Sequence, residues 1–76
     1  MSNDYKEKQF LDALAKRIAS LRKQKGLTQE KLADAADIDR VALANIETGK
    51  RRPTVTTVHR IAIGLSVNVE DIFKSL

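Results

Sequence analysis

Cysteine is absent from this 76-residue chain, and only one histidine is present. Disulfide bonds, thiolate metal sites and cysteine nucleophiles are therefore excluded, as is a zinc site built from cysteine and histidine. No run of apolar residues approaches the roughly 20 that a membrane-spanning helix needs. Residues 1–10 are too polar for a secretory signal peptide. We therefore expect a cytoplasmic protein.

Glycine, proline and aromatic residues are also scarce, with 3 Gly, 1 Pro and 4% aromatic residues. Few aromatic residues argue against a sheet protein, and alanine, leucine and lysine, the most frequent residues, favour helices. A chain this short buries only about 60% of the surface that its unfolded form exposes, so its core is thin. We expect residues 1–76 to form one all-α domain, with residues 1–4 outside its folded part.

The net charge of +4 is unevenly distributed. Residues 16–25 carry five positive charges and no negative one, and residues 40–60 carry five positive charges against Glu47 alone. Between these segments, residues 28–39 hold Lys31 against four acidic residues. This clustering predicts one basic face, which favours a polyanionic partner.

The first predicted helix covers residues 5–25. Asp4 is placed to cap it, and Glu7 three residues later fits a capping box. Gly26 ends the helix, because glycine tolerates the left-handed backbone of a C-cap. Spacings of four, four and three define its predicted buried stripe, which consists of Phe10, Leu14, Ile18 and Leu21.

Four shorter helices follow. Thr28 is expected to cap a helix over Gln29–Ala36, and Asp39 to cap one over residues 40–48. The turn of about three residues between them is typical of a helix-turn-helix motif. The fourth and fifth helices are predicted after the cap residues Thr54 and Asn68. Their expected inner residues are Val55, Val58, Ile61, Ala62 and Leu65 in the fourth, and Val69, Ile72, Phe73 and Leu76 in the fifth.

The third helix presents an unusual outer face once Leu43 and Ile46 are buried. That face holds no acidic residue and consists of Arg40, Val41, Ala44, Asn45 and Thr48. Arginine can bond guanine, asparagine can bond adenine, and valine or alanine can touch a thymine methyl group. The plainer interpretation is a helix half covered by a partner. The pattern favours a helix that reads bases in the major groove.

Residues 28–50 resemble the helix-turn-helix of the phage lambda and 434 repressors and Cro, the XRE family. The matching segment reads TQEKLADAADIDRVALANIETGK, and the similarity extends over about residues 14–73. The resemblance implies a compact five-helix, lambda-repressor-like fold in which the second and third helices form the motif. Asp37 and Ser66 depart from the pattern, because the family usually has glycine at both positions.

The resemblance also implies roles for individual residues. Base edges would be read by Arg40, Val41 and Asn45, with Ala44 beside them. The DNA backbone would be contacted at the start of the second helix and in the loop after the third, by Thr28, Gln29, Lys50, Arg51 and Arg52. Arg22 and Glu47 resemble a buried structural pair that joins the first helix to the end of the third.

One short recognition helix makes few base contacts, so relatives bind as dimers to half-sites about 34 Å apart. The candidate twofold interface consists of Ile63, Val67, Val69 and Leu76, and a rival surface consists of Tyr5, Phe10 and Leu11. The resulting hypothesis is a homodimeric regulator that occupies a dyad-symmetric operator. It would block RNA polymerase or touch it when bound just upstream.

Other functions are less well supported by the sequence. We expect neither an enzyme nor a cofactor, because His59 has no second ligand or nucleophile within reach by spacing. Asp34, Asp37 and Asp39 fit helix caps and surface better than a metal site. The alternative from another class is a protein-interaction adaptor or antitoxin with the same fold. The sequence does not separate restriction–modification controllers, small phage repressors and antitoxins.

Overall fold

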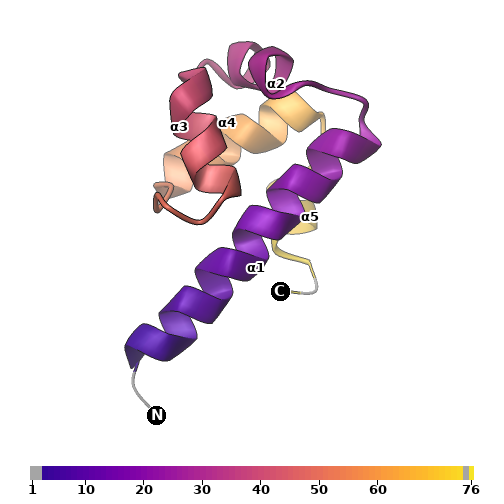
Figure 1. Cartoon of the computed structure of the whole chain (residues 1–76). Helices are drawn as coiled ribbons and strands as arrows, with labels where there is room; N and C mark the ends of the chain where they lie inside the picture. The colour runs from indigo at the N-terminus through magenta and orange to yellow at the C-terminus, as the bar shows by residue number, and fades with distance from the viewer. Residues whose placement is uncertain (1–2, 75) are drawn as a thin grey trace.

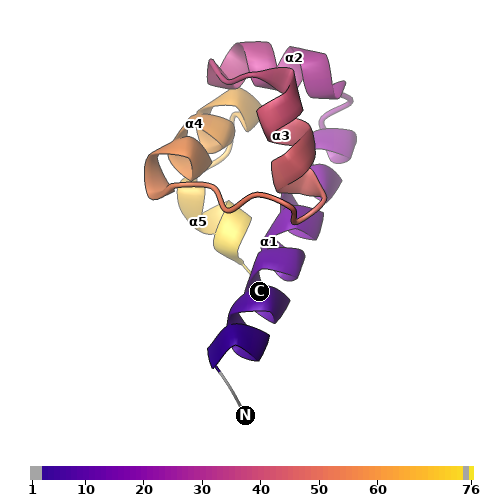
Figure 2. The same cartoon turned by 60° about the vertical axis from the view of Figure 1, so that its left-hand side comes forward.

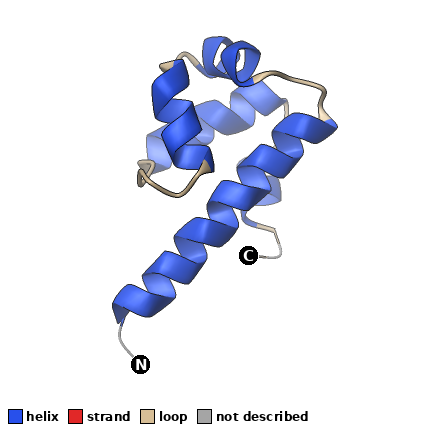
Figure 3. Ribbon diagram, viewed as in Figure 1, coloured by secondary structure: helices blue, strands red, loops and turns tan. Residues whose placement is uncertain are grey.

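The computed structural model of the chain describes residues 3–74 and residue 76, and over these residues it contains helices and no strand (Figures 1 and 3). The helices are α1 (Asn3–Gln24), α2 (Gln29–Ala36), α3 (Arg40–Glu47), α4 (Val55–Leu65) and α5 (Val69–Phe73). The expected all-α fold with five helices is confirmed. In the described part of the chain, no helix is long and apolar enough to cross a membrane.

One hydrophobic core joins all five helices. Its largest fully buried side chains come from every helix in turn and are Ile18, Leu32, Leu43, Ile61, Leu65 and Ile72. Burying a side chain of this size contributes about 1.5–3 kcal/mol relative to exposure, so these contacts hold the short helices together. The N-terminal half of α1 projects beyond the other helices (Figure 1). We call its residues 3–13 the α1 arm.

The C-terminal end of α2 lies close against α4, because Gly64 leaves room for it. A Cβ atom at Gly64 would stand 2.9 Å from Cδ1 of Leu32 and 3.1 Å from the backbone nitrogen of Ala36. Helix α4 continues through Gly64 to Leu65. The glycine therefore sets the helix separation without ending the helix.

Several residues that the hydrophobic spacing assigned to the interior are exposed. Val55 is 84% exposed because it occupies the first turn of α4, at the edge of the core. Phe10 is 45% exposed because it lies on the α1 arm, and its ring stacks on Phe73 with a centroid separation of 6.3 Å. Val69 and Phe73 also keep more than a third of their surface exposed.

Both ends of the chain differ from the sequence-based expectation. Helix α1 already includes Asn3 and Asp4, which we expected outside the fold, and residues 1–2 lie outside the described residues. The predicted Asp4 cap is wrong, because Asp4 lies within the first helical turn, where its charge favours the helix dipole. At the other end α5 stops at Phe73, so Leu76 lies beyond the helix.

Candidate nucleic-acid interface

The turn between α2 and α3 is closed by a left-handed residue. Asp37 adopts φ 56° and ψ 48°, and the N–H of Ile38 donates to the carbonyl oxygen of Ala33 over 2.9 Å. This arrangement satisfies carbonyl groups at the end of α2. Aspartate is among the few non-glycine residues that adopt this backbone readily. The tight turn is therefore preserved although the usual glycine is missing.

The two helices of the motif start differently. Thr28 caps α2, and its hydroxyl oxygen accepts a hydrogen bond from the N–H of Lys31 over 3.1 Å. Asp39 occupies the N-cap position of α3, but its side chain makes no capping hydrogen bond. The expected position of the Asp39 cap is confirmed, whereas its expected side-chain role is wrong. Its negative charge still lies beside the positive end of the helix dipole.

Helix α3 buries Leu43 and Ile46 and turns a face without carboxylates outward. Arg40 is exposed, Val41 is 58% exposed, and Ala44 and Asn45 are half-buried. The four predicted base-reading residues thus share an accessible stripe. Thr48 belongs to the same predicted face, but its hydroxyl donates to backbone carbonyl oxygens at the end of α3.

A partly buried polar network fixes this motif to α1. The guanidinium of Arg22 donates to both carboxylate oxygens of Glu47, over 2.8 and 3.0 Å, and to the carbonyl oxygen of Leu27 over 2.9 Å. The side chains of Arg22 and Glu47 are only 12% and 4% exposed. The structural pair expected from the resemblance is therefore present.

Gln29 extends this network, which the sequence did not indicate. Its side-chain Nε2 donates to Oε1 of Glu47 over 3.1 Å. Because an amide nitrogen carries two hydrogens, a second donor remains for another acceptor. The contact joins residues 18 positions apart, and hydrophobic spacing carries no signal for such a polar contact.

The first residues of α2 and α3 meet at one shallow depression. It is lined by Arg22, Thr28, Gln29, Glu30 and Arg40. Two predicted backbone contacts, Thr28 and Gln29, thereby lie beside the predicted base reader Arg40. The first N–H groups of a helix have no intrahelical acceptor and favour anions. Glu30 adds one carboxylate at the rim, which the sequence-based site did not include.

The loop between α3 and α4 is tied to the end of α3. The N–H groups of Lys50 and Arg51 both donate to the carbonyl oxygen of Asn45, over 2.9 and 3.2 Å. Gly49 has φ 79°, a left-handed conformation that favours glycine. Figure 2 shows this loop leaving α3 next to α1 and crossing to α4. We call this loop, which carries Lys50, Arg51 and Arg52, the cationic loop, and its backbone is thus fixed relative to the predicted base-reading stripe.

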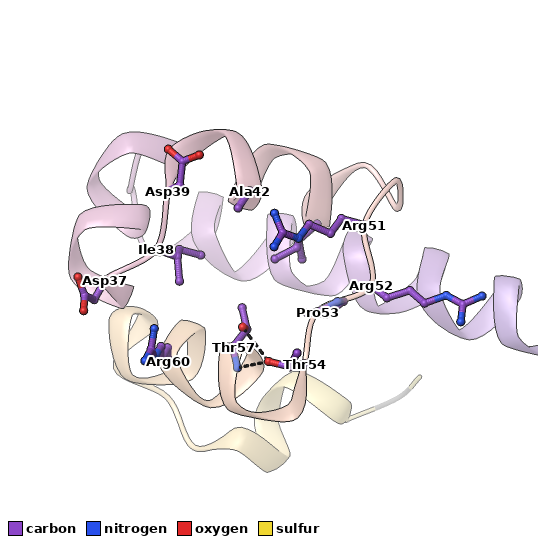
Figure 4. Close-up of a pocket in the computed structure, with 11 residues that line it drawn as sticks. Asp37, Ile38, Asp39, Ala42, Arg51, Arg52, Pro53, Thr54, Thr57 and Arg60 are labelled. Carbon is purple, nitrogen blue, oxygen red and sulfur yellow. Dashed lines mark hydrogen bonds between the residues drawn. The ribbon is translucent and has the colours of Figure 1, made fainter.

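The side chains of the loop cations diverge. The Arg51 side chain extends over a cavity of about 280 Å³ between α3 and α4, and Arg52 points away from that cavity along α1 (Figure 4). The guanidinium of Arg52 forms an ion pair with the carboxylate of Glu7 on the α1 arm. Sequence reasoning assigned Glu7 to a helix cap and missed this pair, which connects exposed side chains far apart in the chain.

The two candidate dimer surfaces both carry partly exposed apolar side chains. In the C-terminal candidate surface, Ile63 is 59%, Leu76 40% and Val69 37% exposed, whereas Val67 is half-buried against the core. On the α1 arm, Tyr5 is 51% exposed and Leu11 is half-buried. Phe73 joins the two surfaces through its stack on Phe10.

Known proteins with a helix-turn-helix resemble this chain in sequence and in fold. The helix-turn-helix family model matches residues 18–72. The control protein C.MunI from a Mycoplasma species is 33% identical over 61 residues, which cover 79% of this chain and 82% of that protein. The crystal structure of the restriction–modification controller C.AhdI from Aeromonas hydrophila superposes with a TM-score of 0.81 and 30% identity, covering 83% of this chain and 96% of that one. Wild-type controller C.Esp1396I gives a TM-score of 0.81 and 32% identity, with 86% of each chain covered. The chain therefore belongs to the helix-turn-helix family, in its XRE-type, repressor-like branch.

Proposed function

We propose that this protein is a sequence-specific transcriptional regulator that reads the major groove of DNA with α3. The observation that carries the proposal is the accessible stripe of α3, which has no carboxylate and offers Arg40, Val41, Ala44 and Asn45. Their side chains match the donor, acceptor and methyl pattern of base edges. The adjacent start of α2 supplies groups that suit a phosphate.

Contacts to the DNA backbone would flank this stripe on two sides. On one side lie Thr28 and Gln29, and the hydrogen bond to Glu47 holds the Gln29 amide in place. On the other side lie Lys50, Arg51 and Arg52 in the loop after α3. Such contacts supply affinity that depends on salt and not on sequence. Because the loop backbone is hydrogen-bonded to Asn45, the residues that contact DNA phosphates and those that read bases would keep a fixed relative position.

The protein would act in the cytoplasm as a homodimer on an operator with dyad symmetry. One α3 contacts only a few base pairs, so two copies are needed for a long site. The likeness to restriction–modification controllers supports a regulatory role of this kind. The interface would use Ile63, Val67, Val69 and Leu76, and a bound dimer could block or touch RNA polymerase. Nothing in this function requires a cofactor or catalysis.

Selection of bound sequences from a random duplex library tests this proposal, with purified protein at about 150 mM salt, where specific and non-specific binding differ strongly. One enriched motif with dyad symmetry is expected. A motif without dyad symmetry would support sequence-specific DNA binding but contradict the symmetric dimer. Folded protein that enriches no sequence would favour the alternative, an adaptor or antitoxin in which Val41 and Ala44 meet a protein.

A further inference from the structure

The ion pair between Glu7 and Arg52 links the α1 arm to the cationic loop. It joins a carboxylate from the second turn of α1 to a guanidinium near the end of the loop. The Arg52 side chain is 72% exposed and the Glu7 side chain 47% exposed. Both groups are therefore hydrated and open to exchange with other ions.

The arm and the loop also meet at a second point. A Cβ atom at Gly49 would stand 2.9 Å from Oδ1 of Asp12, so the loop backbone passes directly over this carboxylate. Asp12 is already balanced by Lys8, whose Nζ lies 3.1 Å from its Oδ2. The charge of Asp12 is thus neutralised within the arm, whereas the charge of Glu7 is directed at a loop cation.

We propose that Glu7 sets the electrostatic affinity of this protein for DNA by competing with DNA phosphate for Arg52. This inference rests on the proposed function, because it assigns Arg52 to the DNA backbone. In the free protein the guanidinium of Arg52 is paired with Glu7. On DNA it exchanges that carboxylate for a phosphate, and Glu7 is left beside a polyanion.

The physical consequence is a lower affinity for DNA and a weaker dependence of that affinity on salt. Exposed ion pairs are weak, so phosphate can displace Glu7, but the exchange yields less than contact by an unpaired arginine. The freed Glu7 carboxylate also attracts part of the cation that the neutralised phosphate releases, which lowers the slope of log affinity against log salt. Base preference is unaffected, because neither Glu7 nor Arg52 lies on the outward stripe of α3. Glu7 therefore limits binding to all sequences alike.

The test compares Glu7→Gln with Glu70→Gln, which makes the same change in net charge at an exposed position on α5. Affinity for a random-sequence duplex is measured between about 50 and 200 mM salt, the range over which electrostatic binding changes steeply. We expect Glu7→Gln to bind about two- to fivefold more tightly than Glu70→Gln, the range set by a weak exposed pair. Its salt slope should be steeper by up to about 0.9.

A double-variant cycle isolates the pair itself. In an Arg52→Ala background, Glu7→Gln should have no more effect than Glu70→Gln. Equal affinities and slopes for the two single variants, while the unmodified protein binds DNA, would overturn this inference and leave the proposed function standing. Weaker binding by Glu7→Gln would also overturn it, since Glu7 would then be positioning Arg52 for contact. Absence of DNA binding by the unmodified protein would overturn the inference and the proposed function together.

Discussion

The side-chain amide of Gln29 donates to the carboxylate of Glu47, whose two oxygens also accept hydrogen bonds from Nε and Nη2 of Arg22. The first residue of α2 is thereby bonded to the last residue of α3, and Glu47 is in turn bonded to Arg22 of α1. Two members of the network, Arg22 and Gln29, line the same depression as Arg40. It fixes the start of α2 relative to α3 and α1.

Replacing Glu47 by Ala should destabilise the fold by about 3 kcal/mol, because it leaves a largely buried guanidinium without its ionic partner. Glu47→Gln should cost less, since its amide oxygen can still accept a hydrogen bond from Arg22. Urea denaturation measures the free energy of unfolding of both variants. The exposed control Glu70→Ala should change the free energy of unfolding by no more than about 0.5 kcal/mol. An equally small effect of Glu47→Ala would show that the network does not hold the motif.

Lys50→Ala should weaken binding to all DNA sequences and flatten the salt slope by about 0.9, the value for one lost phosphate contact. The matched control is Lys74→Ala, an exposed lysine beyond α5 that makes the same change in net charge. Fluorescence anisotropy at several salt concentrations gives both slopes. Identical slopes for the two variants would remove Lys50 from the DNA interface.

A charge placed in the C-terminal apolar surface should separate the subunits. Ile63→Lys and Val69→Lys are each expected to raise the dimer dissociation constant at least about tenfold, because burying an unpaired charge costs several kcal/mol. Tyr5→Lys makes the corresponding change on the α1 arm and should leave the dimer intact. Sedimentation velocity distinguishes the monomer from the dimer. The reverse pattern would assign the interface to the arm.

Ser66→Gly should stabilise the protein. Ser66 has φ 58° at the C-cap of α4, where a side chain is strained and glycine is not. After subtraction of the greater freedom of glycine in the unfolded chain, the net gain should be about 0.5–1 kcal/mol. Asp37→Gly should yield less, because aspartate tolerates this backbone better. A loss of stability in Ser66→Gly, measured by thermal denaturation, would contradict this account of the cap.

The sequence was sufficient to predict those features that depend on local rules. The range Gln29–Ala36 and the start of α3 follow from cap residues and turn length, and the structure has both. Asp37 and Ser66, where the family usually has glycine, both adopt the left-handed backbone that glycine favours. These features are encoded within a few residues of where they occur.

Features that depend on three-dimensional placement were not predictable in the same way. Phe10 continues the spacing of the buried stripe, but the core ends before it reaches the arm, so the ring is partly exposed against Phe73. The Glu7–Arg52 pair connects segments whose proximity depends on the direction in which α1 leaves the domain. Val55 occupies an inward position by periodicity, yet this first residue of α4 lies beyond the core. Helical spacing predicts which side of a helix faces the core, but it does not show how far along the helix the core extends.

The most direct test of the account is to repeat the random-library selection with Asn45→Ala, using Lys50→Ala as the control. A side chain that bonds one base should contribute about 1–3 kcal/mol of discrimination, or roughly ten- to hundredfold, at one base pair of each half-site. The account predicts that Asn45→Ala loses preference at that position and keeps the rest of the motif, whereas Lys50→Ala binds more weakly with an unchanged motif. An unchanged motif in Asn45→Ala would contradict the claim that this face of α3 reads DNA sequence.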